Sequence, residues 1–179
     1  VPLGIGCPGF SNDKTGIAYT ANLPATGQSF RADLKALIPG LVIEQDLKCF
    51  ALSEANGGAG TGCNNVFGLA FGTGLGGAYC IDGRLVKGWQ GLVAEIGHVP
   101  IAAKTVLTYG LSLQPCGCGL TGCLETYVSG PGLAALALDV AGKKMMPLEI
   151  ASAESDGDAK AAQIVNIWLD LAVQALLTV

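Results

Sequence analysis

The chain has 179 residues, of which 50% are hydrophobic and 13% are charged, so it can bury a substantial core and is not a disordered segment. Its net charge of −4 leaves no basic face that could neutralise a phosphate backbone, and we therefore expect no nucleic-acid contact from this segment. The apolar runs are shorter or more interrupted than the roughly 20 residues that a bilayer span needs, so we also expect no membrane span.

Strands and helices alternate along the predicted map, which indicates an α/β fold without internal repeats. We expect buried strands over residues 3–7 and 41–44, a helical turn over 30–37 and a helix over 47–55. An apolar strand over 65–71 leads into a glycine-rich turn at 72–77, and a hairpin follows with Asp82 and Gly83 at its turn.

Residue patterns in the second half of the chain predict two further helices. Ser129 is placed to cap the first helix, with Pro131 in its first turn and its end at Gly142. The second helix follows apolar residues at helical spacing from Ala161 almost to Val179. The chain also starts in an apolar stretch without a leader, so we expect it to be a piece lacking sequence on each side.

Three of the seven cysteines form a knuckle of the pattern C-x-C-x4-C, at Cys116, Cys118 and Cys123. Because an odd number of cysteines without a secretory segment argues against a disulfide framework, we expect a cytoplasmic protein in which clustered thiolates bind metal. The single histidine, His98, is the natural fourth ligand of a structural zinc ion, and an ordinary core histidine is the alternative. The remaining cysteines, at 7, 49, 63 and 80, are predicted to be small core residues.

Several other polar residues have both a structural and a functional interpretation. Asp46 follows a predicted strand and precedes a helix, so it is either a helix cap or a general base at a strand end. Glu95 and Glu125 are either solvated surface residues or acceptors that a metal site holds rigidly for a sugar. The turn at 72–77 precedes a hairpin and not a helix, which excludes a Rossmann fingerprint and leaves an ordinary turn or a cradle for phosphate oxygens.

The stretch from Glu95 to His98, followed by residues 116–130, resembles the signature of the ROK family (repressors, open reading frames and kinases). The turn at 72–77, Asp46 with residues 49–55, and residues 21–24 with 31–34 are further similarities, and the last of these resemble the family's bacterial N-acetylglucosamine kinases. The resemblance covers about residues 4–177 of the chain.

The resemblance implies an actin-like (ribonuclease H-like), two-lobed α/β kinase that transfers the γ-phosphoryl group of ATP, with Mg²⁺, to the 6-hydroxyl of an N-acetylhexosamine. N-acetylglucosamine is the expected substrate. Residues 1–46 would belong to the amino-terminal lobe and residues 47–179 to the second lobe, which would end in a truncated helix.

The resemblance also assigns roles to individual residues. Asp46 would be the general base, and Thr73 and Gly74 would face the ATP phosphates. The sugar would be bound by a set of residues that also includes one zinc ligand: Gly9, Asn22, Gln45, Glu95, His98 and Glu125.

The chain departs from the family pattern at two positions and lacks two segments. Gln45 and Lys48 each stand where an asparagine is expected, and the longer side chain of Gln45 shifts its amide and so affects one hydrogen bond to the sugar. A phosphate loop would precede Val1 and a nucleotide-binding segment would follow Val179, so we expect these 179 residues alone not to turn over ATP.

Three functions remain open at this point. The leading one is the sugar kinase, with a hexosamine and ATP as partners and a homodimer as the common state of the family. A ROK transcriptional repressor would use the same pocket for a sugar inducer. A zinc-stabilised binding domain without catalysis is the third, and the substitutions Gln45 and Lys48 are compatible with it.

Overall fold

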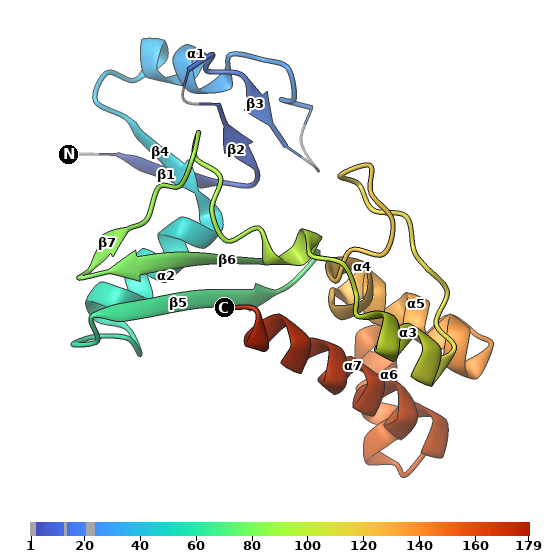
Figure 1. Cartoon of the computed structure of the whole chain (residues 1–179). Coiled ribbons are helices and arrows are strands. Elements are labelled where there is room, and N and C mark those ends of the chain that lie inside the picture. Colours follow the sequence, from blue (N-terminus) through green and yellow to red (C-terminus); the bar gives the residue numbers. More distant parts are fainter. Residues whose placement is uncertain (1–2, 13, 21–23) are drawn as a thin grey trace. The chain divides into compact units, whose positions relative to one another are not determined.

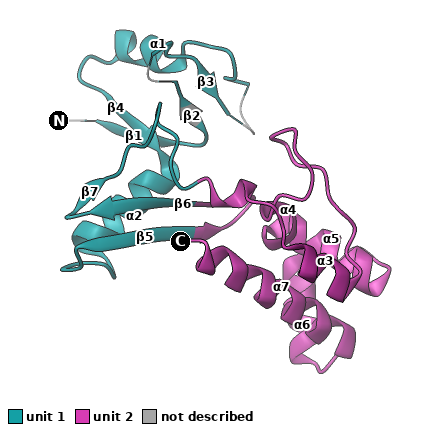
Figure 2. Ribbon diagram, viewed as in Figure 1, with its two compact units in different colours: residues 1–69, 77–94 teal, residues 70–76, 95–179 magenta. Residues whose placement is uncertain are grey.

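A computed structural model describes residues 3–12, 14–20 and 24–179 (Figure 1). The chain divides into two compact units, one of residues 1–69 with 77–94 and one of residues 70–76 with 95–179 (Figure 2). The predicted alternation of strands and helices is observed. The predicted boundary between two lobes after residue 46 is a different division of the chain, and it stays a prediction.

The first unit is built around short strands and two helices. Its elements are β1 (Gly4–Cys7), β2 (Phe10–Ser11), β3 (Ala18–Tyr19), α1 (Phe30–Leu37), β4 (Val42–Gln45), α2 (Asp46–Gly57), most of β5 (Asn65–Phe71) and β6 (Leu75–Ile81), and β7 (Arg84–Leu85). Strands β1 and β4 pair in parallel, with Gly4 opposite Val42 and Cys7 opposite Gln45. Strands β2 and β3 form an antiparallel pair.

The prediction that the first two strands are buried is wrong for one face of the β1–β4 pair. Helix α2 contacts both strands, and Ile43 is only 4% exposed. Val42 is 64% exposed, because successive side chains of a strand point to opposite faces and no described element buries this one.

The three-stranded sheet has the order β5-β6-β7. The predicted hairpin is confirmed: Asp82 and Gly83, with φ of 49° and 70°, join β6 to the antiparallel β7. Small buried residues form the core between α2 and this sheet, namely Ala51, Ala55, Ala78 and Cys80. Cys80 is thus the core residue that we predicted, whereas Cys63 is exposed in the turn after α2, contrary to prediction.

The second unit is mainly helical. Its elements are the 3₁₀ turn η1 (Ile96–His98), α3 (Ala103–Tyr109), α4 (Glu125–Val128), α5 (Gly130–Ala141), α6 (Pro147–Ser155) and α7 (Ala159–Leu177). Ser129 caps α5 as predicted, since its hydroxyl accepts the backbone N–H of Gly132 at 3.1 Å. Helix α7 packs against α4, α5 and α6, and the indole of Trp168 donates to Val128 O at 2.9 Å.

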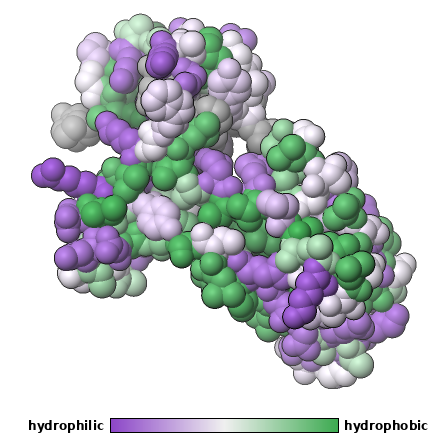
Figure 3. All heavy atoms as spheres, in the orientation of Figure 1, coloured by the Kyte–Doolittle hydropathy of each residue, from purple (hydrophilic) through white to green (hydrophobic). Residues whose placement is uncertain are grey.

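Apolar side chains also reach the surface of both units (Figure 3). Helix α7 illustrates this, because it buries Ile164, Ile167 and Leu171 while Leu169 and Val173 are about half exposed. Within the described part of the chain, no helix combines the length and the apolar character that a membrane crossing requires.

Candidate functional site

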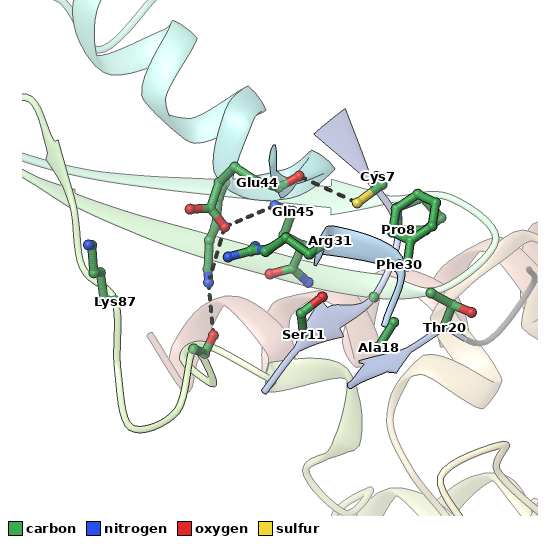
Figure 4. Close-up of a pocket in the computed structure, with 13 residues that line it drawn as sticks. Cys7, Pro8, Ser11, Ala18, Thr20, Phe30, Arg31, Glu44, Gln45 and Lys87 are labelled. Atoms are coloured by element: carbon green, nitrogen blue, oxygen red, sulfur yellow. Dashed lines mark hydrogen bonds and ion pairs between the residues drawn. The ribbon is translucent and has the colours of Figure 1, made fainter. Parts of the chain in front are cut away.

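A cavity of about 80 Å³, lined by both polar and apolar residues, lies within the first unit, where β1, β4 and α2 meet the β2–β3 pair (Figure 4). Two residues predicted to bind the sugar, Gly9 and Gln45, line it. The other lining residues are Cys7, Pro8, Ser11, Ala18, Thr20, Phe30, Arg31, Glu44, Lys48, Lys87 and Gly91. A third predicted sugar ligand, Asn22, lies outside the described residues.

Gly9 occupies a position that only glycine fits. Its φ is +79°, and a Cβ atom there would collide with Tyr19 O. The backbone can therefore turn tightly from β1 into β2 and approach the cavity closely.

Asp46 is the first residue of α2, directly after β4. Its side chain is exposed, and Oδ1 accepts the backbone N–H of Leu47 at 2.8 Å. The N-cap residue is Gln45, whose own side chain makes no capping hydrogen bond. Asp46 is thus not the N-cap residue, but its carboxylate does satisfy one N–H of the first turn of α2. Its position at the end of a strand next to the cavity also suits a general base, so both interpretations remain open.

The cavity also contains charged residues to which the sequence analysis assigned no role. Lys48 is 5% exposed, and its ammonium group donates to Gly91 O at 2.8 Å and lies 3.7 Å from Glu44 Oε1. Glu44 lies in β4 and Lys48 in the first turn of α2, so this ion pair is not a pair within one helix, and local spacing did not indicate it. The partner 43 residues away could not be inferred locally.

The predicted metal ligands lie together in the second unit. One donor atom from each of His98, Cys116, Cys118 and Cys123 lies within 4.8 Å of the others. The Sγ atoms of Cys118 and Cys123 are 3.6 Å apart, and His98 Nδ1 is 3.6 Å from Cys116 Sγ. A tetrahedral zinc site with Zn–S bonds of about 2.3 Å has ligand–ligand edges of about 3.8 Å, so these donors fit such a site after small shifts.

Local backbone turns explain how the knuckle forms. Cys116 N–H donates to Leu120 O at 2.8 Å and Gly119 N–H donates to Cys116 O at 3.0 Å, which folds the segment back on itself. Cys123 then pairs as an isolated bridge with Pro100, close to His98. The sequence thus brings the histidine and the last cysteine together through backbone pairing.

The electrostatic environment of the three thiols is uneven. Burial, with a further contribution from the hydrogen bond to Glu125, raises the pKa of Cys116 to about 12. The pKa of Cys118 is lowered, mainly because its sulfur accepts a backbone hydrogen bond from Leu120. A cation is the group that would hold all three sulfurs as thiolates at neutral pH.

The carboxylate of Glu125 lies against this cluster. Its Oε1 is 3.1 Å from Cys116 Sγ and 3.6 Å from His98 Nδ1, and its Oε2 accepts the backbone N–H of Leu75 at 3.4 Å. Glu95 is exposed and is the N-cap residue of η1. The adjacent Gly97 must be glycine, because a Cβ atom there would collide with Leu75 O.

The turn between β5 and β6 is shorter than predicted, because β6 already begins at Leu75. Thr73 lines a cavity of about 270 Å³ together with Gln114, Pro115, Glu125, Thr126, Ser129, Pro131 and Gly132. Gly72 O accepts the backbone N–H of Gly130 at 2.8 Å, and a Cβ on Gly74 would lie 2.8 Å from Glu125 Oε2. The structure therefore brings Thr73 and Gly74 together with Glu125 and the start of α5.

The predicted site residues thus fall into two groups. Gly9, Gln45 and Asp46 belong to the first unit. The second unit contains the others that the structure describes: Thr73, Gly74, Glu95, His98, Cys116, Cys118, Cys123 and Glu125.

Comparison with known proteins supports the resemblance. The chain is 38% identical over 173 residues to an N-acetyl-D-glucosamine kinase of Aliivibrio fischeri (strain ATCC 700601 / ES114), covering 94% of this chain and 57% of that protein. It is 40% identical over 171 residues to the N-acetylgalactosamine kinase AgaK of Shewanella sp. (strain ANA-3), covering 94% of this chain and 55% of that protein. The chain thus spans about half the length of the curated relatives that it matches.

The fold comparison agrees with the sequence comparison. The crystal structure of a ROK hexokinase from Thermus thermophilus superposes with a TM-score of 0.83 at 26% sequence identity, covering 99% of this chain and 57% of that one. The α/β arrangement is therefore that of the actin-like sugar kinases, as predicted. The ROK family model matches residues 1–179, and the chain belongs to the ROK family.

Proposed function

We propose that the protein containing this chain is an ATP-dependent kinase that phosphorylates the 6-hydroxyl of an N-acetylhexosamine, with N-acetylglucosamine as the expected substrate. The observation that carries the proposal is the 38% identity to an N-acetyl-D-glucosamine kinase over nearly the whole chain. Asp46 follows directly after Gln45, which lines the cavity of the first unit. The similarity to relatives that are named kinases favours this function over a repressor that binds a sugar inducer.

In the proposed mechanism, Asp46 accepts the proton of the substrate hydroxyl as its oxygen attacks the γ-phosphoryl group. Its exposed carboxylate at the start of α2 is sterically accessible to a substrate. Mg²⁺ would be bound with ATP and would neutralise charge on the phosphates. Thr73 and Gly74 are proposed to face those phosphates, since the turn presents a hydroxyl group and backbone amides.

The remaining roles concern the sugar. Gln45, Glu95, His98 and Glu125 are proposed to hydrogen-bond sugar hydroxyls, and Gly9 and Asn22 to lie near the acetamido group. Carboxylates suit this task because each can accept several hydroxyl protons. The identity of the hexosamine is the open point within this proposal, since an N-acetylgalactosamine kinase is as similar as the N-acetylglucosamine kinases.

The decisive experiment is a coupled ATP-consumption assay of the full-length protein with N-acetylglucosamine, N-acetylgalactosamine, N-acetylmannosamine and glucose. Asp46→Asn should lower kcat by about 100- to 10,000-fold, because a general base contributes about that much, while sugar binding is retained. Asp33→Asn is the matched control, since Asp33 is an exposed aspartate on α1. No ATP consumption with any sugar would refute the kinase, and unchanged turnover in Asp46→Asn would refute the role of Asp46.

We further propose that His98, Cys116, Cys118 and Cys123 bind one structural Zn²⁺, which holds the loops next to Glu95 and Glu125. All seven cysteines are free thiols, which agrees with the reducing, cytoplasmic setting that we propose. If free zinc is about 100 times its Kd, the ion stabilises the folded state by about 2.7 kcal/mol.

Metal analysis should find one zinc per chain, and chelation should lower the melting temperature. Cys123→Ser should lose the metal, whereas Cys63→Ser, at an exposed cysteine outside the cluster, should keep it. A metal-free protein with unchanged stability would rule out the zinc site. The same preparation tests the proposed homodimer by light scattering.

A further inference from the structure

Lys48 is the most deeply buried charged residue of the first unit's cavity, and it forms the centre of a short polar network. Its ammonium group donates to Gly91 O at 2.8 Å and lies 3.7 Å from Glu44 Oε1. The same carboxylate oxygen accepts the backbone N–H of Gln45 at 2.9 Å. The network therefore runs without interruption from Gly91 to the backbone of Gln45.

One end of this network is the junction between β4 and α2. Glu44 and Gln45 are the last residues of β4, Gln45 is also the N-cap of α2, and Asp46 follows directly. The side chain of Gln45 makes no capping hydrogen bond, so the bond from Gln45 N–H to Glu44 Oε1 restrains the backbone just before the helix, next to the bond that Asp46 Oδ1 accepts from Leu47 N–H.

The other end is the loop 88–92, which closes through a bridge between Trp89 and Leu92. Its backbone is unusual, because Gln90 and Gly91 both have positive φ, at 52° and 85°. The side-chain amide of Asn12 donates to Gln90 Oε1 at 2.6 Å, so the loop is tied to the start of the β2–β3 connection as well. Lys48 supplies the tie to α2.

The burial of Lys48 makes this tie more than a surface ion pair. Its side chain is 6% exposed and that of Glu44 is 31% exposed. An ammonium group removed from water is costly unless it is paired and hydrogen-bonded, so its hydrogen bond and its ion pair constrain both partners strongly. A lysine side chain is long enough to span from α2 to the loop while keeping both contacts.

We propose that Lys48 is a positioning residue, which fixes the loop 88–92 and the β4–α2 junction to each other and thereby holds Asp46 in its reactive position. This inference rests on the proposed kinase function. Lys48 acts through Glu44, Gln45 and Gly91, and it takes no proton from the substrate. It is distinct from the roles assigned above, none of which includes Lys48 or Glu44.

The test compares variants of the full-length protein. Lys48→Met keeps the length of the side chain but removes the charge and the donors, and it should lower kcat for the sugar by about 10- to 100-fold. The KM for ATP should stay within twofold of the parent value. Lys48→Arg, which keeps a cationic donor, should recover most of the lost rate. Lys35→Met, at an exposed lysine on α1, should match the parent.

Glu44→Gln provides a second variant in case Lys48→Met does not fold. It keeps an oxygen for Gln45 N–H but removes the ion pair, so it should also lower kcat, by a smaller factor. The two effects should be non-additive in the double variant, because both residues belong to one network.

Amide hydrogen exchange gives a readout that is independent of catalysis. In Lys48→Met, exchange should become faster in residues 88–92 and at Gln45, while α1 should be unchanged. Parent-like kcat in Lys48→Met, or unchanged exchange at both places, would overturn the proposal. If the parent phosphorylates no sugar, the proposed function fails and the positioning role fails with it; faster exchange would then still establish the tether.

Discussion

Ala94, directly before Glu95, offers a test of how the backbone is held at this part of the chain. Three non-glycine residues in the described part of the chain have positive φ, and Ala94 is one of them, at 58°. An L-residue in the left-handed region loses about 1–2 kcal/mol relative to the right-handed region, and alanine has no polar side chain that could compensate. A glycine at this position avoids this cost but lowers the stability of the folded state by about 0.4–1 kcal/mol, because it gives the unfolded chain more conformational freedom.

We therefore expect Ala94→Gly to stabilise the protein by about 0.5–1 kcal/mol, the difference between the two effects. Urea unfolding should show a higher midpoint at an unchanged m-value. Ala151→Gly is the matched control, because Ala151 lies inside α6, where glycine should destabilise by about 1 kcal/mol. If both variants lower the midpoint equally, Ala94 is not strained and the reasoning is wrong.

Three further predictions concern the second unit and the thiols. Ser129→Ala should destabilise by about 1 kcal/mol in urea unfolding, because the buried cap of α5 is lost, and Ser155→Ala, at an exposed serine that caps no helix start, should have little effect. In native protein treated with a metal chelator, iodoacetamide should modify Cys118 well before Cys80, because Cys118 is exposed with a lowered pKa while burial raises the pKa of Cys80. Mass spectrometry measures the two rates of modification, and equal rates would contradict this prediction. The hydrogen bond to Asp170 raises the pKa of Tyr109, so this bond stabilises the folded state fully below about pH 10, and the stabilisation is lost as the pH rises through the higher folded-state pKa. The difference in unfolding free energy between the parent and Tyr109→Phe should therefore vanish above that pKa, and a difference that persists would exclude the contribution of this hydrogen bond.

The sequence predicted the bounds of an element correctly where a local pattern of residues specifies that element. Strand β5 and helix α1 have the predicted bounds, and α5 begins at the predicted cap. Helix α3 was not predicted, because it has seven residues, a single buried side chain and no side-chain cap. The four residues of α4 were missed for a similar reason, since so short a helix carries no periodic pattern.

The candidate metal site was predictable because its ligands are chemically distinctive and closely spaced. Three thiols within eight residues and a single histidine leave few arrangements, and the structure brings the four donors together. The contact between Glu125 and Cys116 was not predictable in the same way. Spacing alone indicates only that Glu125 lies near the cluster and gives no orientation of its carboxylate.

The two departures from the family pattern, Gln45 and Lys48, converge on one atom of the structure. The backbone N–H of Gln45 and the ammonium group of Lys48 both face Glu44 Oε1, at 2.9 and 3.7 Å. Gln45 thus contributes its backbone N–H to the network, and it also lines the cavity. A substitution at 45 can therefore change the proposed contact with the sugar without breaking the network, whereas a substitution that removes the cationic donor at 48 breaks it. The two positions should accordingly affect different kinetic constants, with KM for the sugar sensitive to residue 45 and kcat sensitive to residue 48.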